Sequence, residues 1–219
     1  MKYNYKNNTE FKKTRDEVII EYCKGKKVLH IGATDSPFTE EKFNNNLLLH
    51  CKINSVTNDL LGIDIDQDSI NYLRNKGYNN IITFDMNNLM ELEFMPDIII
   101  FGETIEHLLN LEIALTNIKR IMKNDTKLII STPNAMWINK IINTLFSFED
   151  QHIDHKIIFS YATLSNLFRV TGFKLEKVYF TFLNRKHEGI SKYIKKSFCH
   201  MFNGFSETIL AVVSLNENN

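Results

Sequence analysis

The chain has 219 residues, of which 43% are hydrophobic and 24% charged, and its formal net charge is zero. This length suits one full-sized domain, which we expect to span residues 1–219. A neutral chain lacks the global basic charge typical of nucleic-acid-binding proteins, so nucleic acid is not an expected partner. Three widely spaced cysteines and the lack of any long apolar run predict a cytoplasmic protein without membrane insertion.

The pattern of apolar residues predicts alternating helices and strands. After a frayed start over residues 1–10, a helix is expected over residues 10–24, where Gly25 ends it. Short β-rich runs follow at residues 27–31, 60–65, 80–84, 97–101, 127–131, 174–182 and 207–215. Further helices are expected at residues 39–52, 67–76, 110–122 and 161–171. This alternation predicts an α/β fold: a doubly wound, Rossmann-like, mostly parallel seven-stranded sheet with helices on both faces.

The first three strands end in residues that suit a nucleotide. The first ends in HIGATDS, where Gly32 permits a sharp turn and a close backbone approach. Asp64 follows about 30 residues later, at a position from which a carboxylate accepts hydrogen bonds from ribose hydroxyls. Asp85 and Met86 end the third strand, where they suit the edge and face of an adenine. Singly, each aspartate has a plain explanation as a turn or cap residue. Together they indicate a nucleotide site.

The segment PDIIIFGETIEHLL, residues 96–109, is an apolar strand that gives way at Gly102 to charged side chains. On a helix, Glu103, Glu106 and His107 would share one face. They follow the carboxyl end of a buried strand, where open α/β sheets place their ligand crevices. This convergence suits a divalent metal. The structural alternative is that the carboxylates cap a helix start while His107 packs against a neighbour.

A second polar group lies far along the chain, in the segment FEDQHIDHKIIFSY of residues 148–161. It contains His152, Asp154 and His155, just before the last long helix. Divalent ions take several ligands from different segments of a chain. The two glutamates and the histidine of residues 103–107, with one distant histidine, would supply four.

The chain from about residue 26 to its end resembles the class I S-adenosylmethionine-dependent methyltransferases. The segments that carry the resemblance are VLHIGATDS, GIDID, FDM, PDIIIFGETIEHL and KLIISTPN. It implies a cofactor site made of Gly32, Ala33, Thr34, Asp64, Ile65, Asp85, Met86, Gly102 and Glu103. Within this set, Gly32, Ala33 and Asp64 would hold the methionine and ribose parts and the pair at residues 85–86 the adenine. The pair at residues 102–103 would lie near the methionine end.

The first motif departs from the family pattern, which is an acidic residue followed by Gly-x-Gly-x-Gly. This chain instead has His30, Gly32, Ala33, Asp35 and Ser36. Asp35 is a candidate partner for the cofactor's ammonium group. The missing glycines leave open a degenerate, non-catalytic protein of this fold that regulates or scaffolds a partner.

One branch of the superfamily is particularly similar: the small-RNA 3′-terminal 2′-O-methyltransferases. They share the GExxEH-like turn, a strand that ends in STPN, and an aspartate–histidine pair before an aromatic residue. That resemblance implies a magnesium ion held by Glu103, Glu106, His107 and His155, which grips a terminal ribose diol. The chain also resembles small bacterial methyltransferases of sugar, capsule and natural-product pathways, and quinone-type O-methyltransferases. The motifs therefore specify the chemistry better than the substrate.

We expect an S-adenosylmethionine-dependent O-methyltransferase, assisted by Mg²⁺ or Mn²⁺, that acts on a hydroxylated small molecule such as a phosphorylated or nucleotide-linked sugar. Without a metal, His107 or His155 would act as general base, so both are candidate catalytic residues. RNA 3′-terminal ribose 2′-O-methylation and a scaffold role are the alternatives.

Two variable regions are expected to concern partners. The aromatic-rich insertion at about residues 135–160, with Trp137, Phe146 and Phe148, would form a lid over the acceptor, or else core or oligomer contacts. A homodimer is left open. The basic run Arg185–Lys196 would meet a phosphate or, as is usual for such runs, form solvated surface.

Overall fold

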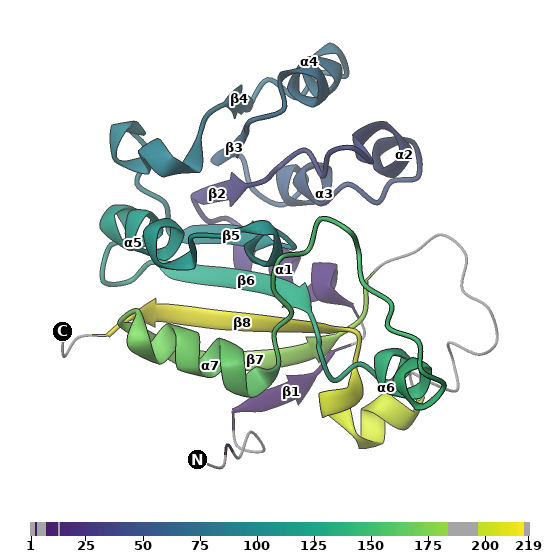
Figure 1. The fold of residues 1–219 in the computed structure, drawn as a ribbon. Coiled ribbons are helices and arrows are strands. Elements are labelled where there is room, and N and C mark those ends of the chain that lie inside the picture. Colours follow the sequence, from purple (N-terminus) through teal and green to yellow (C-terminus); the bar gives the residue numbers. More distant parts are fainter. Residues whose placement is uncertain (1–2, 4–7, 13, 184–196, 217–219) are drawn as a thin grey trace.

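The computed structural model describes residues 3, 8–12, 14–183 and 197–216. Within these residues the chain forms one eight-stranded sheet of order β1-β7-β8-β6-β5-β2-β3-β4 (Figure 1). The strands are β1 (Thr9–Phe11), β2 (Val28–Ile31), β3 (Leu60–Asp64), β4 (Ile81–Thr83), β5 (Ile98–Gly102), β6 (Lys127–Pro133), β7 (Phe173–Thr181) and β8 (Thr208–Leu215). Only β8 runs antiparallel to its described neighbours, β6 and β7. The predicted mostly parallel, doubly wound sheet is confirmed.

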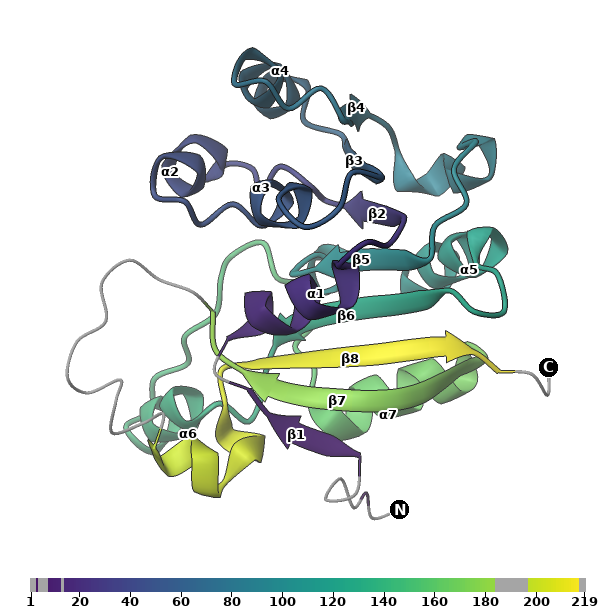
Figure 2. The same ribbon diagram turned by 180° about the vertical axis from the view of Figure 1, so that it is seen from behind.

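Helices cover both faces of this sheet (Figures 1 and 2). The α-helices are α1 (Arg15–Cys23), α2 (Thr39–Asn44), α3 (Leu49–Asn54), α4 (Gln67–Asn75), α5 (Leu111–Ile121), α6 (Ile138–Leu145) and α7 (Tyr161–Val170). The 3₁₀ turns are η1 (Met86–Glu91), η2 (Ile105–His107) and η3 (Asn203–Phe205). Apolar residues of α1 and α3 pack with one face of the central strands, and those of α5 and α7 pack with the other.

Strand β5 shows why its sequence is an unbroken apolar run. Ile98 and Ile100 belong to the core cluster that α1 and α3 cover, whereas Ile99 and Phe101 belong to the cluster that α5 and α7 cover. Successive side chains of a strand point to opposite faces, so a strand buried on both faces needs apolar residues at every position. Burial of each such side chain contributes about 1.5–3 kcal/mol.

The predicted number of strands, seven, is wrong, because the segment expected to be frayed contributes an eighth. Residues Thr9–Phe11 pair in parallel with residues 178–180 of β7. The helix expected over residues 10–24 begins only at Arg15, where Thr14 forms a capping box with Glu17. A three-residue strand carries too little periodicity to be distinguished by pattern, and it exists here because β7 offers a free edge.

The helix expected over residues 39–52 is also corrected, because the structure divides it into α2 and α3. Asn46 between them adopts a left-handed conformation, with φ of 56°. Asparagine tolerates that conformation better than most residues, so the chain turns there and the helix ends.

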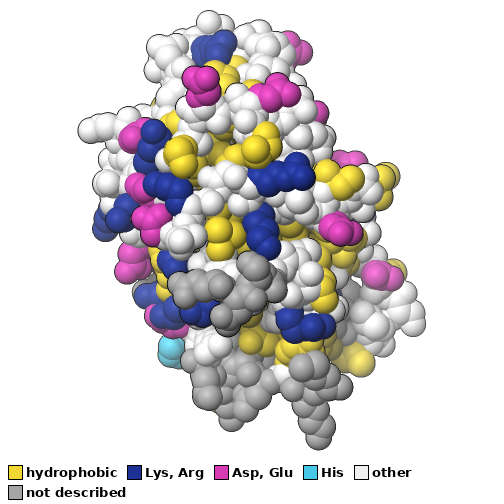
Figure 3. All heavy atoms as spheres, turned by 90° about the vertical axis from the view of Figure 1, so that its left-hand side faces the viewer, with side chains coloured by type: hydrophobic (Ala, Val, Ile, Leu, Met, Phe, Trp, Pro, Cys, Tyr) yellow, Lys and Arg dark blue, Asp and Glu magenta, His cyan; other side chains and the backbone are white. Residues whose placement is uncertain are grey.

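The strand order reverses at β2, which lies between β5 and β3. The loops after β2 and β5 therefore leave the sheet side by side, and open α/β sheets bind ligands at such switch points. On the side of the molecule where the parallel strands begin, Lys and Arg side chains are interspersed with acidic and apolar ones (Figure 3). Among the described residues, no helix combines the length and apolar character needed to cross a membrane.

Candidate active site at the carboxyl edge of the sheet

At Gly32 the loop after β2 lies against the loop after β5. Its φ is 71°, and a Cβ atom placed on it would lie 2.8 Å from the Oγ1 atom of Thr104. The backbone N–H groups of Gly32 and Ala33 both donate to the carbonyl oxygen of Ile63, at 3.0 and 3.2 Å. The predicted first motif and the GETIEH turn are thus in direct contact, and only glycine fits between them.

Asp64 stands at the end of β3 with its carboxylate fixed by four hydrogen bonds. Its Oδ2 atom accepts from the backbone N–H and the hydroxyl of Thr34, at 3.0 and 2.7 Å. Its Oδ1 atom accepts from the backbone N–H groups of Ile65 and Asp66, at 2.8 and 3.2 Å. These four hydrogen bonds occupy all the positions at which a carboxylate usually accepts. A ribose hydroxyl at this site would therefore have to replace one of these donors, and the Thr34 hydroxyl is the one that is not part of the backbone.

Three further residues of the predicted cofactor site, Ile65, Asp85 and Met86, follow the ends of β3 and β4. The side chain of Ile65 is 74% exposed, although it is large and apolar. Asp85 caps η1 by accepting from the backbone N–H of Asn87 at 2.8 Å, and Met86 packs partly against the core. The capping role considered for Asp85 is present, while Ile65 presents an apolar surface with no described partner that buries it.

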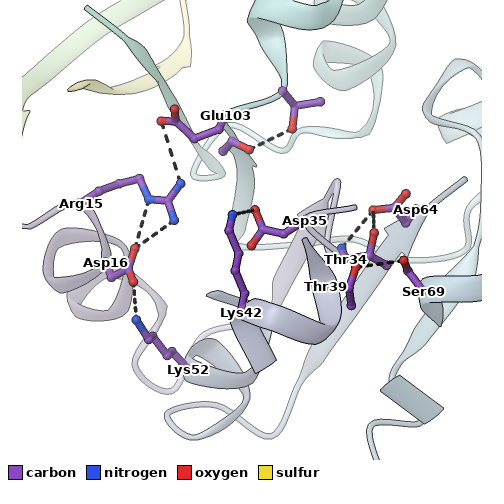
Figure 4. A network of polar contacts seen from close by, with 12 residues as sticks. Arg15, Asp16, Thr34, Asp35, Thr39, Lys42, Lys52, Asp64, Ser69 and Glu103 are labelled. Carbon is purple, nitrogen blue, oxygen red and sulfur yellow. Dashed lines mark hydrogen bonds and ion pairs between the residues drawn. The ribbon is translucent and has the colours of Figure 1, made fainter. Parts of the chain in front are cut away.

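Glu103, predicted at the methionine end of the cofactor and as a metal ligand, turns toward α1. Its φ of 47° is left-handed, and its Oε1 atom lies 3.9 Å from the Nη1 atom of Arg15 (Figure 4). Burial raises the pKa of Glu103, against the lowering effect of Arg15. Beside this pair, Lys42 forms an ion pair with Asp35 at 2.7 Å.

Arg15 was missed by the sequence reasoning. It is only 6% exposed, its Nε atom donates to Oδ1 of Asp16 at 3.1 Å, and its Nη2 atom forms an ion pair with the same oxygen at 3.0 Å. The capping box at Thr14 would have located the start of α1 and thus placed Arg15 in its first turn. No local pattern shows, however, that this turn packs against the sheet edge.

Glu106, His107 and His155 form the second part of the site. One potential ligand atom from each lies within 4.8 Å of the others. The Nε2 atom of His155 is 4.0 Å from Oε1 of Glu106, and the rings of His107 and His155 are 4.8 Å apart. These three of the four predicted metal ligands come together, and Glu103 is not in the group.

The carboxyl group of Glu106 is buried without a hydrogen bond among the described residues. The residue is 1% exposed, and neither carboxyl oxygen has a hydrogen bond among the described residues. Burial, followed by the charge of Glu103, raises the pKa of Glu106 to about 8. Burial, followed by the proximity of His107, lowers the pKa of His155 to about 4. Burial of a carboxyl group without a hydrogen bond is costly, so these atoms are suited to receive a cation.

The loop that carries His155 is attached to η2 through the backbone. The N–H groups of Lys156 and Ile157 donate to the carbonyl oxygen of Glu106, at 2.8 and 3.2 Å. The Nδ1 atom of His107 lies 3.3 Å from the carbonyl oxygen of Asp154. Because a carbonyl can only accept, Nδ1 must carry the proton in that bond, and Nε2 keeps the lone pair that a metal needs.

The helix predicted for the GETIEH segment is wrong, since only residues Ile105–His107 form a turn, η2, of 3₁₀ type. Glu103 precedes this turn in the left-handed conformation. The spacing rule that placed both glutamates on one helix face therefore does not apply. The Glu103 carboxylate lies toward α1, and the Glu106 carboxylate lies toward the loop that carries His155.

The aromatic insertion does not form a uniform layer. Phe146 and Phe148 are each 70% exposed, and α6 buries none of its residues. Trp137 instead holds its Nε1 atom buried without a hydrogen bond among the described residues. The basic run Arg185–Lys196 lies within residues 184–196, which are outside the described part of the chain.

Comparison with known proteins identifies the family. Residues 13–178 match the family model described as "Methyltransferase domain". No curated protein matches the chain. A SAM-dependent methyltransferase from Archaeoglobus fulgidus is 20% identical, with a TM-score of 0.59 and 91% of each chain covered. Magnesium protoporphyrin IX methyltransferase from Synechocystis PCC 6803, solved with bound SAH, is 10% identical with a TM-score of 0.60, and 92% of this chain and 82% of that one are covered.

A third solved structure, the N-methyltransferase NodS from Bradyrhizobium japonicum, is 12% identical, with a TM-score of 0.52 and 93% of each chain covered. The second and third of these proteins are named for different methyl acceptors, magnesium protoporphyrin IX and a nitrogen atom, and all three identities are low. The similarity of this chain to these proteins therefore shows the fold alone. The chain belongs to the methyltransferase domain family, and its fold is that of the S-adenosylmethionine-dependent methyltransferases.

Proposed function

We propose that the protein transfers a methyl group from S-adenosylmethionine to a hydroxyl oxygen of a small molecule, with a divalent metal held by Glu106, His107 and His155. The observation that carries this proposal is the convergence of these three side chains around a buried carboxyl group that has no hydrogen bond. They lie at the sheet edge beside the loops that belong to the cofactor site in this fold.

The cofactor residues are those at the ends of β2, β3 and β5. Asp64 would accept a hydrogen bond from one ribose hydroxyl in place of the Thr34 hydroxyl, and the exposed side chain of Ile65 would cover the adenine together with Met86. Gly32 and Ala33 would let the backbone approach the cofactor, and Asp85 would lie at the adenine edge. S-adenosylmethionine, when bound, supplies an electrophilic methyl group on a sulfonium ion.

The metal ligands are one carboxylate and two imidazoles. This mixed set suits Mn²⁺, whereas Mg²⁺ prefers oxygen ligands throughout. A divalent ion held there would lower the pKa of a coordinated hydroxyl. The protein's own part is orientation: the backbone bonds from residues 156 and 157 to Glu106 keep His155 against η2. Alternatively, His107 or His155 would take the proton directly as general base.

The reaction balances without a further reactant. A C–O bond forms between the acceptor oxygen and the methyl carbon, and the S–C bond of the sulfonium breaks. The hydroxyl proton leaves to solvent or to an imidazole, and S-adenosylhomocysteine is the second product. Holding the two reacting atoms in line is the main catalytic task.

The acceptor is proposed to be a small hydroxylated molecule, such as a phosphorylated or nucleotide-linked sugar, in the cytoplasm. The neutral net charge argues against nucleic acid. RNA 3′-terminal 2′-O-methylation is the second candidate, because a metal next to a methyl donor also suits a terminal ribose diol. The third is a scaffold that binds no cofactor.

Two experiments separate these candidates. Calorimetry with S-adenosylhomocysteine should show clear binding, and its absence would favour the scaffold. Transfer of labelled methyl groups should then be measured with Mn²⁺ or chelator on a panel of sugars, nucleotide sugars and an RNA with a free 3′ diol. Methylation of the RNA alone would favour the second candidate.

His155→Ala tests the role of the triad formed by Glu106, His107 and His155. This variant should bind S-adenosylhomocysteine as the wild type does and lose turnover. His152→Ala is the matched control, because this exposed histidine lies 5.3 Å from the His155 ring but outside the triad. If His155→Ala stays fully active with and without chelator, both the metal and the general-base mechanisms are wrong.

A further inference from the structure

Helix α6 presents an apolar face that the rest of the described chain does not bury. Four of its aliphatic residues follow the i, i+3, i+4, i+7 spacing of such a face: Ile138, Ile141, Ile142 and Leu145. A helix with this spacing normally packs its apolar face onto a core. In α6, however, no residue is buried, and Phe146 and Phe148 continue the exposed apolar run beyond the helix.

A second exposed apolar segment lies beside α6. Residues 197–201 are helical and are followed by η3. The carbonyl oxygen of Gly204 accepts from Nδ2 of Asn134 at 2.8 Å, which ties this segment to the chain just before α6 (Figure 1). We call the apolar face of α6, with its exposed neighbours, the α6 surface. These neighbours are Met136, Phe146, Phe148, Phe198, Met201 and Phe202.

The composition and size of the α6 surface suit a protein interface. Phenylalanine and methionine, which make up these neighbours, are enriched at the centres of such interfaces. The four phenylalanines are between 40% and 70% exposed, so they alone expose about 350–550 Å². A stable interface buries about 800 Å² on each partner. They would therefore supply about half of what a dimer needs.

The charges at this surface favour a second copy of the chain as the partner. Lys140 is the only basic residue of α6, and the exposed acidic residues Glu149 and Asp150 directly follow Phe148. A surface of acidic lipids would repel these carboxylates. A two-fold interface places one surface against itself, so it needs both signs of charge on that surface. The zero net charge of the chain also removes repulsion between two copies.

The α6 surface is connected to the candidate metal site. The Nζ atom of Lys140 donates to the carbonyl oxygen of Asp150 at 2.6 Å. The side-chain amide of Gln151 then donates to the carbonyl oxygen of His155 at 3.1 Å. The loop that carries His155 is thus attached to α6 by side chains that are themselves at the surface. Anything that holds α6 in place also holds this loop.

We propose that two copies of the chain pair through the α6 surface about a two-fold axis, and that this pairing steadies the loop that carries His155. The first part does not depend on the proposed function. The second part rests on it, because it concerns the proposed metal site.

Sedimentation equilibrium tests the pairing. The wild type should be a dimer at micromolar concentration. The double variant Phe146→Ser, Phe148→Ser should raise the dimer dissociation constant at least about 100-fold, because each copy loses two buried aromatic side chains. Val170→Ser is the matched control: this exposed residue lies near Gly172, whose carbonyl oxygen accepts from Asn216 beyond the far end of β8. It should leave the dimer unchanged.

Hydroxyl-radical footprinting of the unmodified surface locates the interface independently of folding in the variant. Met136 and Met201 belong to the α6 surface, whereas Met90 and Met95 are similarly exposed elsewhere. In the wild-type dimer the first two should be oxidised several-fold more slowly than in the diluted monomer. The other two methionines should be oxidised equally in both.

Mn²⁺ binding tests the second part. The double variant should bind Mn²⁺ several-fold more weakly than the wild type and S-adenosylhomocysteine equally well. Equal Mn²⁺ affinity would remove the effect on the His155 loop. A wild type that binds no Mn²⁺ would instead contradict the proposed metal site, while the dimer is still judged by sedimentation and footprinting.

Three results would overturn the pairing. They are a wild type that stays monomeric at the highest concentration reached, a double variant that dimerises like the wild type, and a dimer in which Met136 and Met201 are oxidised as in the monomer. If the monomeric wild type instead sediments with phosphatidylglycerol vesicles, the α6 surface serves a membrane and the inference is wrong.

Discussion

The carboxyl group of Glu106 should make the stability of the metal-free protein fall as pH rises. It is 1% exposed, neither oxygen has a hydrogen bond, and its pKa is raised from 4.5 to about 8. In the folded protein it keeps its proton at neutral pH, whereas in the unfolded chain it ionises above pH 4.5. The folded state therefore binds more protons in this window, and its stability decreases from pH 4.5 to pH 8.

The size of the effect follows from the two pKa values. At about 1.4 kcal/mol for each pH unit between 4.5 and 8, the loss reaches about 5 kcal/mol. Glu106→Gln removes the ionisation and keeps the shape. The free energy of unfolding of the variant minus that of the wild type should thus rise by about 4 kcal/mol from pH 5 to pH 8.5.

Urea unfolding with chelator, at a series of pH values, measures this difference. Groups that do not interact with Glu106 titrate alike in both proteins, so their contributions cancel. Glu176→Gln is the control: burial opposes ionisation there, but hydrogen bonds from Lys127 and Ser214 keep the pKa of Glu176 lowered. The free energy of unfolding of Glu176→Gln minus that of the wild type should stay constant above pH 6. If the difference in free energy of unfolding between Glu106→Gln and the wild type is also constant with pH, the reasoning is refuted. Mn²⁺ should stabilise the wild type and not the Gln variant.

Four further substitutions test the fold and the nucleoside site. Gly62→Ala should cost about 1–3 kcal/mol in urea unfolding, because its Cβ would lie 2.5 Å from Cε1 of His50. Gly102→Ala, whose nearest contact would be an ordinary 3.4 Å, should cost less. Ser160→Ala should cost about 1 kcal/mol by removing the cap of α7, and an unchanged midpoint would contradict that role. Ile65→Ser should weaken 5′-methylthioadenosine several-fold in calorimetry, and equal affinity would exclude Ile65 from the adenine site.

The central strands could be predicted because burial on both faces imposes a strong pattern. Residues 98–102 and 127–133 contain unbroken apolar runs, and the structure confirms both strands near their expected bounds. The acidic residue at the end of β3 was predicted for the same reason, since the strand before it is well defined. The edge strand β1 was not, because three residues carry no usable periodicity.

The candidate site was predicted in part. Glu106, His107 and His155 were expected together, and the structure brings them together, although a bound metal stays a prediction. Glu103 was misplaced because helical spacing was assumed where the backbone adopts a left-handed turn. Arg15 was missed because its role depends on tertiary packing of α1 against the sheet, which no short sequence pattern encodes.

Both outermost strands of the sheet, β1 and β4, are only three residues long. An edge strand exposes about half of its backbone N–H and C=O groups, so each edge offers very few sites for pairing with another chain. Growth of the sheet by addition of a second molecule is therefore disfavoured at both edges. A protein with a large, strongly apolar sheet thus protects itself from edge-to-edge aggregation through the shortness of its two border strands.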